Sequence, residues 1–247
     1  MDQHRYKPSD AGRRTLAECR SFQHWNAICD YVFRGGSDLE TFGGQFTANG
    51  SGSWANGLLD LFVTSGTSFG IPFTATYTLT DTTRGRFTAV DTPQGGTPDN
   101  LALYALGQGA VLFVDLNSAG GAQGEFYSSS AGPYTLASLN GSYSFALQGC
   151  PLTGNNCSGE YTQTGVFTAD GNGNVTVSVD TNNEGLLSTQ TLISGSYVVG
   201  DSGSDGGLIT TSAGKMRFRF VDTGDLLLED GDSAPSRRVL GSASKQN

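Results

Sequence analysis

The chain has 247 residues, a net charge of −9 and 36 glycines. The glycines follow no collagen period and separate short apolar runs, which indicates tight turns in a folded protein rather than disorder. Nucleic acid is not expected as a partner, because an acidic surface repels phosphate backbones, and no transmembrane segment is expected, because no apolar run reaches about 18 residues.

The N-terminal segment, residues 1–27, matches nothing later in the chain and contains both histidines, His4 and His24. We expect it to be poorly ordered or to form a short helix around residues 16–29. It has no apolar core of the kind that a signal peptide requires. Two interpretations follow. Either the true start lies upstream, or the protein is cytoplasmic. The pairing of Cys19 with Cys29 stays open.

An internal repeat follows this segment. The heptapeptide FTANGSG at residues 46–52 returns as FTADGNG at residues 167–173. A repeat of this length indicates whole duplicated domains rather than a solenoid. We therefore predict one domain at residues 28–130, a linker at 131–137 and a second domain at 138–247. Shorter matches in the same order pair residues 31–33, 75–79, 85–88 and 111–115 with residues 143–145, 195–199, 206–209 and 226–230.

The second copy predicts eight strands, each bounded by Gly, Asn or Asp turn signals. They cover residues 141–147, 161–169, 174–181, 188–199, 207–212, 215–221, 225–230 and 239–245. Short connections predict antiparallel neighbours, and eight such strands can close into a barrel that has no exposed edge. The predicted fold is all-β: two tandem antiparallel eight-stranded meander barrels of lipocalin or avidin size. A β-sandwich is the alternative.

Alternation within residues 215–220 assigns the two faces of one strand. The inward-facing set is Met216, Phe218 and Phe220, and the set facing water is Lys215, Arg217 and Arg219. The outer face of the second copy contains Arg217, Arg219, Leu227 and Glu229. The matching positions in the first copy are, in the same order, Ala102, Tyr104, Leu112 and Val114. An apolar outer face of this kind forms a contact surface. We expect it to pack against the second domain or another protein.

The two copies contain no histidine, which excludes Ser-His-Asp and Cys-His catalysis and the usual zinc sites. Carboxylates remain, and Glu229, Asp230 and Asp232 lie together at a predicted strand end. Such a cluster is more often solvated than paired for glycoside hydrolysis. We therefore expect a protein that is not an enzyme and has no cofactor.

Two further motifs admit a binding role. Asp170, Asn172 and Asn174 resemble the first half of a calcium loop, but Asp and Asn beside Gly are also what a hairpin turn requires. No other metal site is predicted. Trp54 aligns with Val175; it lies either in the core or against a ligand such as a sugar or a lipid.

Cys150 and Cys157 close a short turn-rich loop that has no cysteine in the first copy. The spacing favours a disulfide, which in turn favours an oxidising compartment. The location expected from this is extracellular or in the cell envelope, with the cytoplasm as the alternative.

Four segments carry a resemblance: LNGSYSF at residues 139–145, GVFTADGNG at 165–173, GSYVV at 195–199 and GSASKQ at 241–246. They resemble a tandem β-repeat domain of unknown function found in proteins of soil bacteria that are predicted to be secreted or surface-bound. The resemblance covers residues 28–247. It implies the fold and an extracellular location, and it transfers no catalytic residue.

These observations favour a non-enzymatic secreted or envelope module with a binding or structural role. Its candidate contact residues are Ala102, Tyr104, Leu112, Val114 and Trp54, and its expected partner is a protein or a small apolar ligand. Two alternatives stay open. One is a calycin-like carrier of a small apolar ligand, which needs an unfilled barrel. The other is a carboxylate-based hydrolase.

Overall fold

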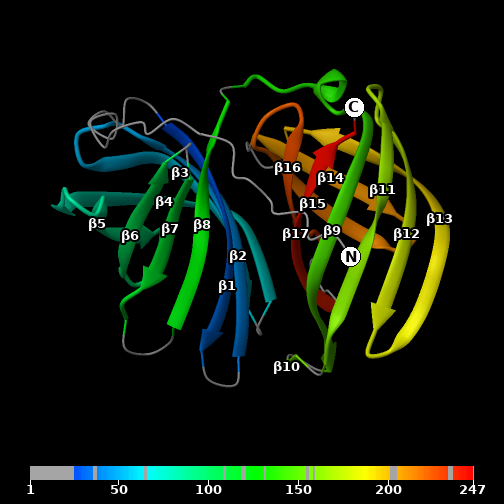
Figure 1. Cartoon of the computed structure of the whole chain (residues 1–247), viewed down its shortest axis with the longest axis horizontal. Coiled ribbons are helices and arrows are strands. Elements are labelled where there is room, and N and C mark those ends of the chain that lie inside the picture. Colours follow the sequence, from blue (N-terminus) through cyan, green and yellow to red (C-terminus); the bar gives the residue numbers. More distant parts are fainter. Residues whose placement is uncertain are drawn as a thin grey trace, which may run out of the picture.

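The structure is a computed structural model that describes residues 25–246 apart from gaps at 36–37, 64–65, 108–109, 118–120, 131, 154–155, 158, 201–204 and 233–235. The described residues form two β-sheets that lie side by side, with β1–β8 in one and β9–β17 in the other (Figure 1). One short 3-10 helix, η2 (Leu136–Ser138), precedes the second sheet. None of the described helices is long and apolar enough to cross a membrane. The all-β prediction is confirmed.

The first sheet is a closed barrel in which every strand pairs antiparallel with its sequence neighbours and β8 closes onto β1. Its strands are β1 (Trp25–Gly35), β2 (Asp38–Ala48), β3 (Ser53–Val63), β4 (Gly66–Asp81), β5 (Arg86–Pro93), β6 (Asp99–Gly107), β7 (Ala110–Asp115) and β8 (Gly121–Ser129). The barrel predicted for the first copy is therefore present. The helix expected around residues 16–29 is wrong from Trp25 onward, since β1 begins there, and residues 1–24 lie outside the described residues.

The second sheet has nine strands in the order β10-β9-β11-β12-β13-β14-β15-β16-β17, and β17 also pairs with β9. Its strands are β9 (Asn140–Thr153), β10 (Asn156–Cys157), β11 (Tyr161–Asp170), β12 (Asn174–Asn183), β13 (Leu186–Val199), β14 (Gly206–Thr211), β15 (Gly214–Phe220), β16 (Asp225–Asp230) and β17 (Arg237–Lys245). All eight predicted strands are present; seven agree with their expected bounds to within two residues, and β9 runs six residues beyond its expected end. The short β10 was not predicted, because two paired residues carry no periodic signal.

The repeated heptapeptides form the same hairpin turn in both sheets. Asn49 Oδ1 accepts the backbone N–H groups of Ser51 and Ser53 at 2.8 and 3.0 Å. Asp170 Oδ1 accepts those of Asn172 and Asn174 at 2.7 and 3.0 Å. The glycines at the second and fourth turn positions have positive φ in both copies, a conformation that favours glycine. The repeated heptapeptide sequence therefore marks equivalent turns in the two sheets.

The pairing registers correct two of the shorter sequence matches. Phe46 lies opposite Ala27, and its equivalent Phe167 lies opposite Tyr143, so Tyr143 corresponds to Ala27 and not to Tyr31. The sequence match of residues 85–88 with 206–209 is one residue away from the register that the strand pairing gives. Short strands with similar alternation align almost equally well at several offsets, and only the ladder hydrogen bonds fix the register.

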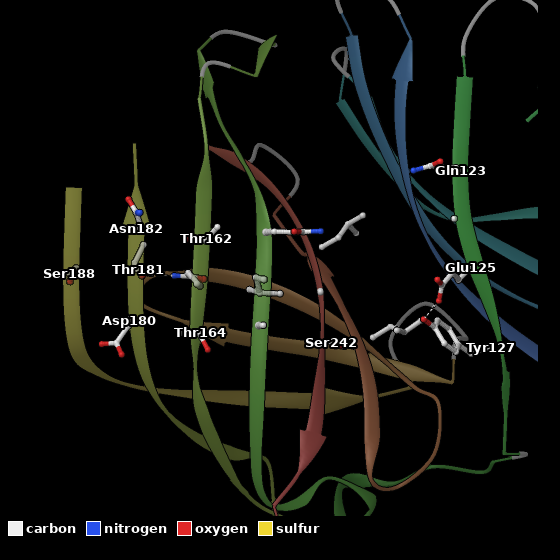
Figure 2. Close-up of a pocket in the computed structure, with 18 of the residues that line it drawn as sticks. Gln123, Glu125, Tyr127, Thr162, Thr164, Asp180, Thr181, Asn182, Ser188 and Ser242 are labelled. Atoms are coloured by element: carbon white, nitrogen blue, oxygen red, sulfur yellow. Dashed lines mark hydrogen bonds between the residues drawn. The ribbon is translucent and has the colours of Figure 1, made fainter. Parts of the chain in front are cut away.

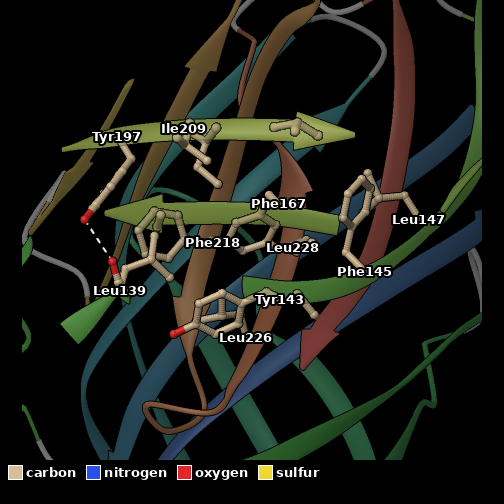
Figure 3. Close-up of a cluster of buried hydrophobic side chains, with 14 of the residues drawn as sticks. Leu139, Tyr143, Phe145, Leu147, Phe167, Tyr197, Ile209, Phe218, Leu226 and Leu228 are labelled. Carbon is tan, nitrogen blue, oxygen red and sulfur yellow. Dashed lines mark hydrogen bonds between the residues drawn. The ribbon is translucent and has the colours of Figure 1, made fainter. Parts of the chain in front are cut away.

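Each sheet encloses a core of buried apolar side chains. The first contains Phe46, Trp54, Phe73, Phe87, Leu103 and Phe126 among others, and the second contains Tyr143, Phe145, Phe167, Tyr197, Phe218 and Leu228 among others (Figure 3). Phe218 and Phe220 point inward as predicted, and Met216 is partly buried against the same core. The cavity found at one end of the second core measures only about 50 Å³.

Candidate functional site

A groove of about 1000 Å³ lies between the two sheets (Figure 2). Outward-facing residues of β7 and β8 form one wall, and strands β9, β11, β12, β13, β16 and β17 form the other. The apolar side chains that line it come from both walls: Leu112, Val114, Tyr127, Ala146, Leu187, Leu227 and Leu240. We take this groove, which is concave and lined by both sheets, as the candidate site.

The first-sheet wall contains part of the apolar outer face predicted from the sequence. In β7, Phe113 points into the core, while Leu112 and Val114 are 38% and 39% exposed on the opposite face. Cross-strand pairing sets Ala102 opposite Val114, and Tyr104 opposite Leu112. In the second sheet the matching pairs are Arg217 with Glu229 and Arg219 with Leu227. The sequence comparison of the two outer faces therefore used the correct register.

Not every predicted contact residue reaches the groove. Ala102 is buried, and Tyr104 is 40% exposed but does not line the groove; its ring centroid lies 6.0 Å from the Arg86 guanidinium carbon. Trp54 lies in the core, where its ring stacks on Phe46 at a centroid distance of 4.1 Å. Burial leaves Trp54 unavailable to a ligand at the surface, so the core interpretation holds.

The sequence did not identify the second-sheet wall. Threonines and amides on the outer faces of β9, β11 and β12 look like ordinary solvated positions, and they become groove-lining only when the other sheet lies beside them. The polar lining residues of the second sheet are Gln148, Thr162, Gln163, Thr164, Asp180, Thr181, Asn182, Ser188, Thr189 and Ser242. Only the alternation of each strand was available as a signal, and alternation cannot reveal what faces a strand in space.

Two carboxylates lie in the groove. The Tyr127 hydroxyl donates a hydrogen bond to Glu125 Oε2 on the same strand, β8. On the opposite wall, Asp180 Oδ1 accepts the backbone N–H of Gln190 at 2.6 Å. Figure 2 shows both side chains, with Glu125 on β8 of the first sheet and Asp180 on β12 of the second.

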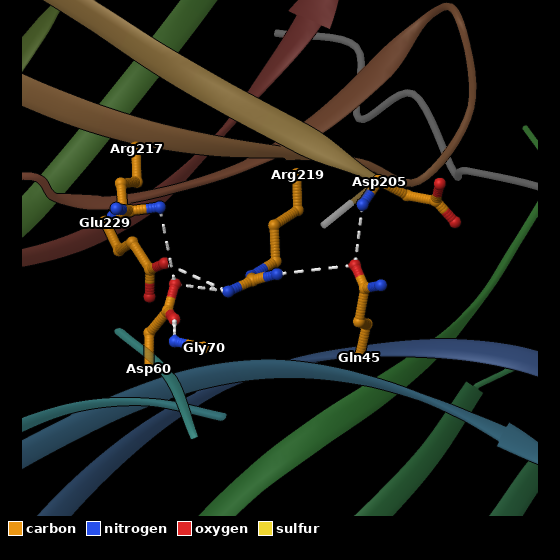
Figure 4. Close-up of polar contacts among 7 residues, drawn as sticks. All are labelled: Gln45, Asp60, Gly70, Asp205, Arg217, Arg219 and Glu229. Atoms are coloured by element: carbon orange, nitrogen blue, oxygen red, sulfur yellow. Dashed lines mark hydrogen bonds and ion pairs between the residues drawn. The ribbon is translucent and has the colours of Figure 1, made fainter. Parts of the chain in front are cut away.

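Beside the groove, a buried ion cluster joins the two sheets (Figure 4). Arg219 of β15 donates to Asp60 of β3, and its Nη2 also lies 3.6 Å from Glu229 Oε1. Gly70 donates its backbone N–H to Asp60 Oδ1 at 2.7 Å. The guanidinium carbon of Arg217 lies 3.7 Å from the centroid of the Phe69 ring.

This cluster corrects the prediction that Arg217 and Arg219 face water. Both are buried, at 6% and 3% exposure, because the outer face of β15 packs against the first barrel. Glu229 and Asp230 are buried as well, although a strand-end acidic cluster was expected to be solvated. Burial raises the pKa of Asp230 to about 6. Asp60 and Glu229 both face Arg219, so they form an ion cluster rather than the opposed pair of a glycosidase cleft.

The candidate calcium residues form a turn. Besides its two backbone bonds, Asp170 accepts a hydrogen bond through Oδ2 from the Asn174 side chain at 2.6 Å. These bonds lower the pKa of Asp170, with the Asn174 side chain as the largest cause. Because its carboxylate is used by amide donors of the turn, the hairpin interpretation accounts for all three residues. No group of three or more metal-binding side chains occurs among the described residues.

Cys150 is buried at the end of β9, and Cys157 in β10 pairs with Leu152 through the backbone. The side chain of Cys157 lies outside the described residues, as does Cys19, so both cysteine pairings stay predictions.

Comparisons with known proteins add little. No family model and no curated protein matches the sequence. The crystal structure of CghA with Sch210972 is similar over 90% of this chain and 89% of that chain, at 10% identity and a TM-score of 0.23. At that TM-score the similarity supports no conclusion about function.

Proposed function

We propose that this protein is a non-enzymatic binding protein that holds a small, largely apolar ligand in the groove between its two sheets. One observation carries the proposal: exposed apolar side chains of both sheets converge on a hollow of about 1000 Å³. Cofactor and ligand pockets have volumes of about 300–1,000 Å³ and are lined mainly by apolar groups with a few polar ones. The groove has a volume in this range, and most of its exposed lining surface is apolar although many of its lining residues are polar.

A ligand inside either sheet, as a calycin-like carrier would hold it, is less well supported. Both interiors are packed with aromatic and aliphatic side chains, and the end cavity of about 50 Å³ is far below ligand size. Packed interiors give rigid walls, and rigid walls lose little conformational entropy when a ligand binds between them. The filled cores therefore favour the groove as the binding site.

We also infer that the second sheet is a copy of the first barrel. The pairing of β17 with β9 covers nine residue pairs, as does the closing pairing of β8 with β1. The two equivalent hairpin turns support the same origin. Duplication of one barrel would create two outer faces that then diverged to enclose a shared groove.

The proposed location is extracellular or in the cell envelope, where a carrier or an adhesion module meets its ligand outside the cell. This part of the proposal depends on the predicted Cys150–Cys157 disulfide, because such bonds persist in oxidising compartments.

Titration with N-phenyl-1-naphthylamine, an uncharged fluorophore that brightens in apolar surroundings, tests the groove. We expect saturable binding that Leu112→Gln or Val114→Gln weakens about tenfold, the loss expected from one buried aliphatic contact. Leu106→Gln is the matched control, since Leu106 is 55% exposed in β6 and does not line the groove. Absence of saturable binding, or equal losses in all three variants, would contradict the proposal.

A further inference from the structure

The charged side chains that line the groove are all acidic. Among the described lining residues they are Glu125 and Asp180, and no lysine, arginine or histidine is found. Glu125 belongs to β8 in one wall, and Asp180 belongs to β12 in the other (Figure 2). The chain as a whole carries a net charge of −9, which adds a field of the same sign.

Glu125 is the better placed of the two for a charged ligand. It is only half-buried, and its cross-strand neighbour in β7 is the exposed Leu112. Its strand neighbour on the same face is Tyr127, whose hydroxyl donates to Glu125 Oε2. A carboxylate beside an aromatic ring offers a cation both a charged hydrogen-bond acceptor and the negative face of a π-system.

The apolar surface begins directly at this carboxylate. Val114 lies two residues along β7 from Leu112, and Leu227, Leu240 and Ala146 continue the apolar lining on the other wall. A ligand with a charged head at Glu125 would therefore lay its apolar body against aliphatic side chains. The same carboxylate would repel an anionic head, because two like charges at close range raise each other's energy.

We propose that the groove selects a cationic amphiphile, and this inference rests on the proposed function. The protonated amine head of such a molecule binds at Glu125 and Tyr127, and its apolar body lies along Leu112 and Val114. Anionic amphiphiles such as fatty acids are excluded by the same carboxylates. Asp180, which is exposed on the opposite wall, favours the cation at longer range and does not bind the head.

Three probes of equal chain length separate head charge from apolar binding: decylammonium, decanol and decanoate. Each is titrated calorimetrically, the two ions below their micellar concentrations and decanol below its solubility limit. We expect decylammonium to bind about tenfold or more tightly than decanol, and decanoate to bind most weakly. Glu125→Gln should reduce the affinity for decylammonium to that for decanol and leave decanol binding unchanged. Glu184→Gln, the same substitution at an exposed site outside the groove lining, should change neither.

The outcomes distinguish this inference from the proposed function. If none of the three probes binds, the proposed function fails and this inference fails with it. If all three bind with equal affinity and Glu125→Gln has no effect, the groove is an apolar site without charge selection, and only this inference is overturned. If decylammonium binding survives Leu112→Gln but falls with added salt, the cation binds the acidic surface elsewhere, which also overturns it. Unchanged thermal unfolding of each variant shows that the fold is intact.

Discussion

Arg219 in β15 donates a hydrogen bond to the carboxylate of Asp60 in β3, and both side chains are at most 3% exposed. These residues are 159 positions apart in the chain, and their contact joins the two sheets beside the groove. Gln45 strengthens the same junction, since its Oε1 accepts the backbone N–H of Asp205 at 2.8 Å. The position of one groove wall relative to the other therefore depends on a buried ion pair.

Replacing Asp60 with alanine should lower the free energy of unfolding by about 3 kcal/mol, measured by urea denaturation. Removing one partner of a buried pair costs about 3–5 kcal/mol, and the lower end applies here because Glu229 still faces Arg219. Arg84→Ala is the control, since it removes the exposed Arg84 side chain from its pair with Asp81, keeps the turn bonds of Asp81 and should change stability little. A loss no larger than that of the control would show that the Asp60 pair does not hold the sheets together.

Stability should fall as the pH rises from about 4 to about 7, in part because of Asp91. Burial first, and then the nearby Asp99 carboxylate, raise the pKa of Asp91 to about 7 from an ordinary value of 3.8. In this interval the folded state holds a proton that the unfolded state has released, so the contribution of Asp91 to stability is present at low pH and lost near neutrality.

Asp91→Asn isolates this effect. The variant should be more stable than the parent protein at pH 8 and should show a flatter dependence of the unfolding free energy on pH. The residual slope should include Asp230, whose pKa is also raised and which therefore acts in the same direction. Parallel profiles for variant and parent would mean that Asp91 is ionised in the folded state at pH 5–6.

Phe167→Ala should lower the free energy of unfolding by about 3–5 kcal/mol, the usual cost of removing a large aromatic side chain from a packed core. Phe167 is fully buried and stacks on Tyr143 at a centroid distance of 5.0 Å. Thr176→Ala, on the exposed face of the neighbouring β12, is the control and should change stability by at most about 0.5 kcal/mol. Chemical denaturation of both variants measures the difference, and comparable losses would argue against the assigned faces.

The disulfide prediction can be tested by alkylating the protein without reduction and identifying the peptides by mass spectrometry. We expect Cys150 and Cys157 to be recovered in one linked peptide when the protein is produced in an oxidising compartment. A loop this short is stabilised by about 2–3 kcal/mol on closure, so Cys150→Ser with Cys157→Ser should lower stability by that amount. Recovery of both cysteines as alkylated thiols would contradict the pairing and remove the argument for export.

The sequence by itself determined the all-β class, the eight predicted strands of the second sheet and the equivalent turns at residues 49–52 and 170–173. These features depend on local chemistry: alternation sets the face of a residue, and Asn, Asp and Gly set the turn. Only the tertiary structure decided which outer faces meet. Arg217 and Arg219 alternate as exposed residues do, and they are buried because another domain covers them; Leu112 and Val114 look like an interface and instead line a groove. A periodic pattern distinguishes inside from outside within one sheet, but it carries no information about a second sheet more than a hundred residues away.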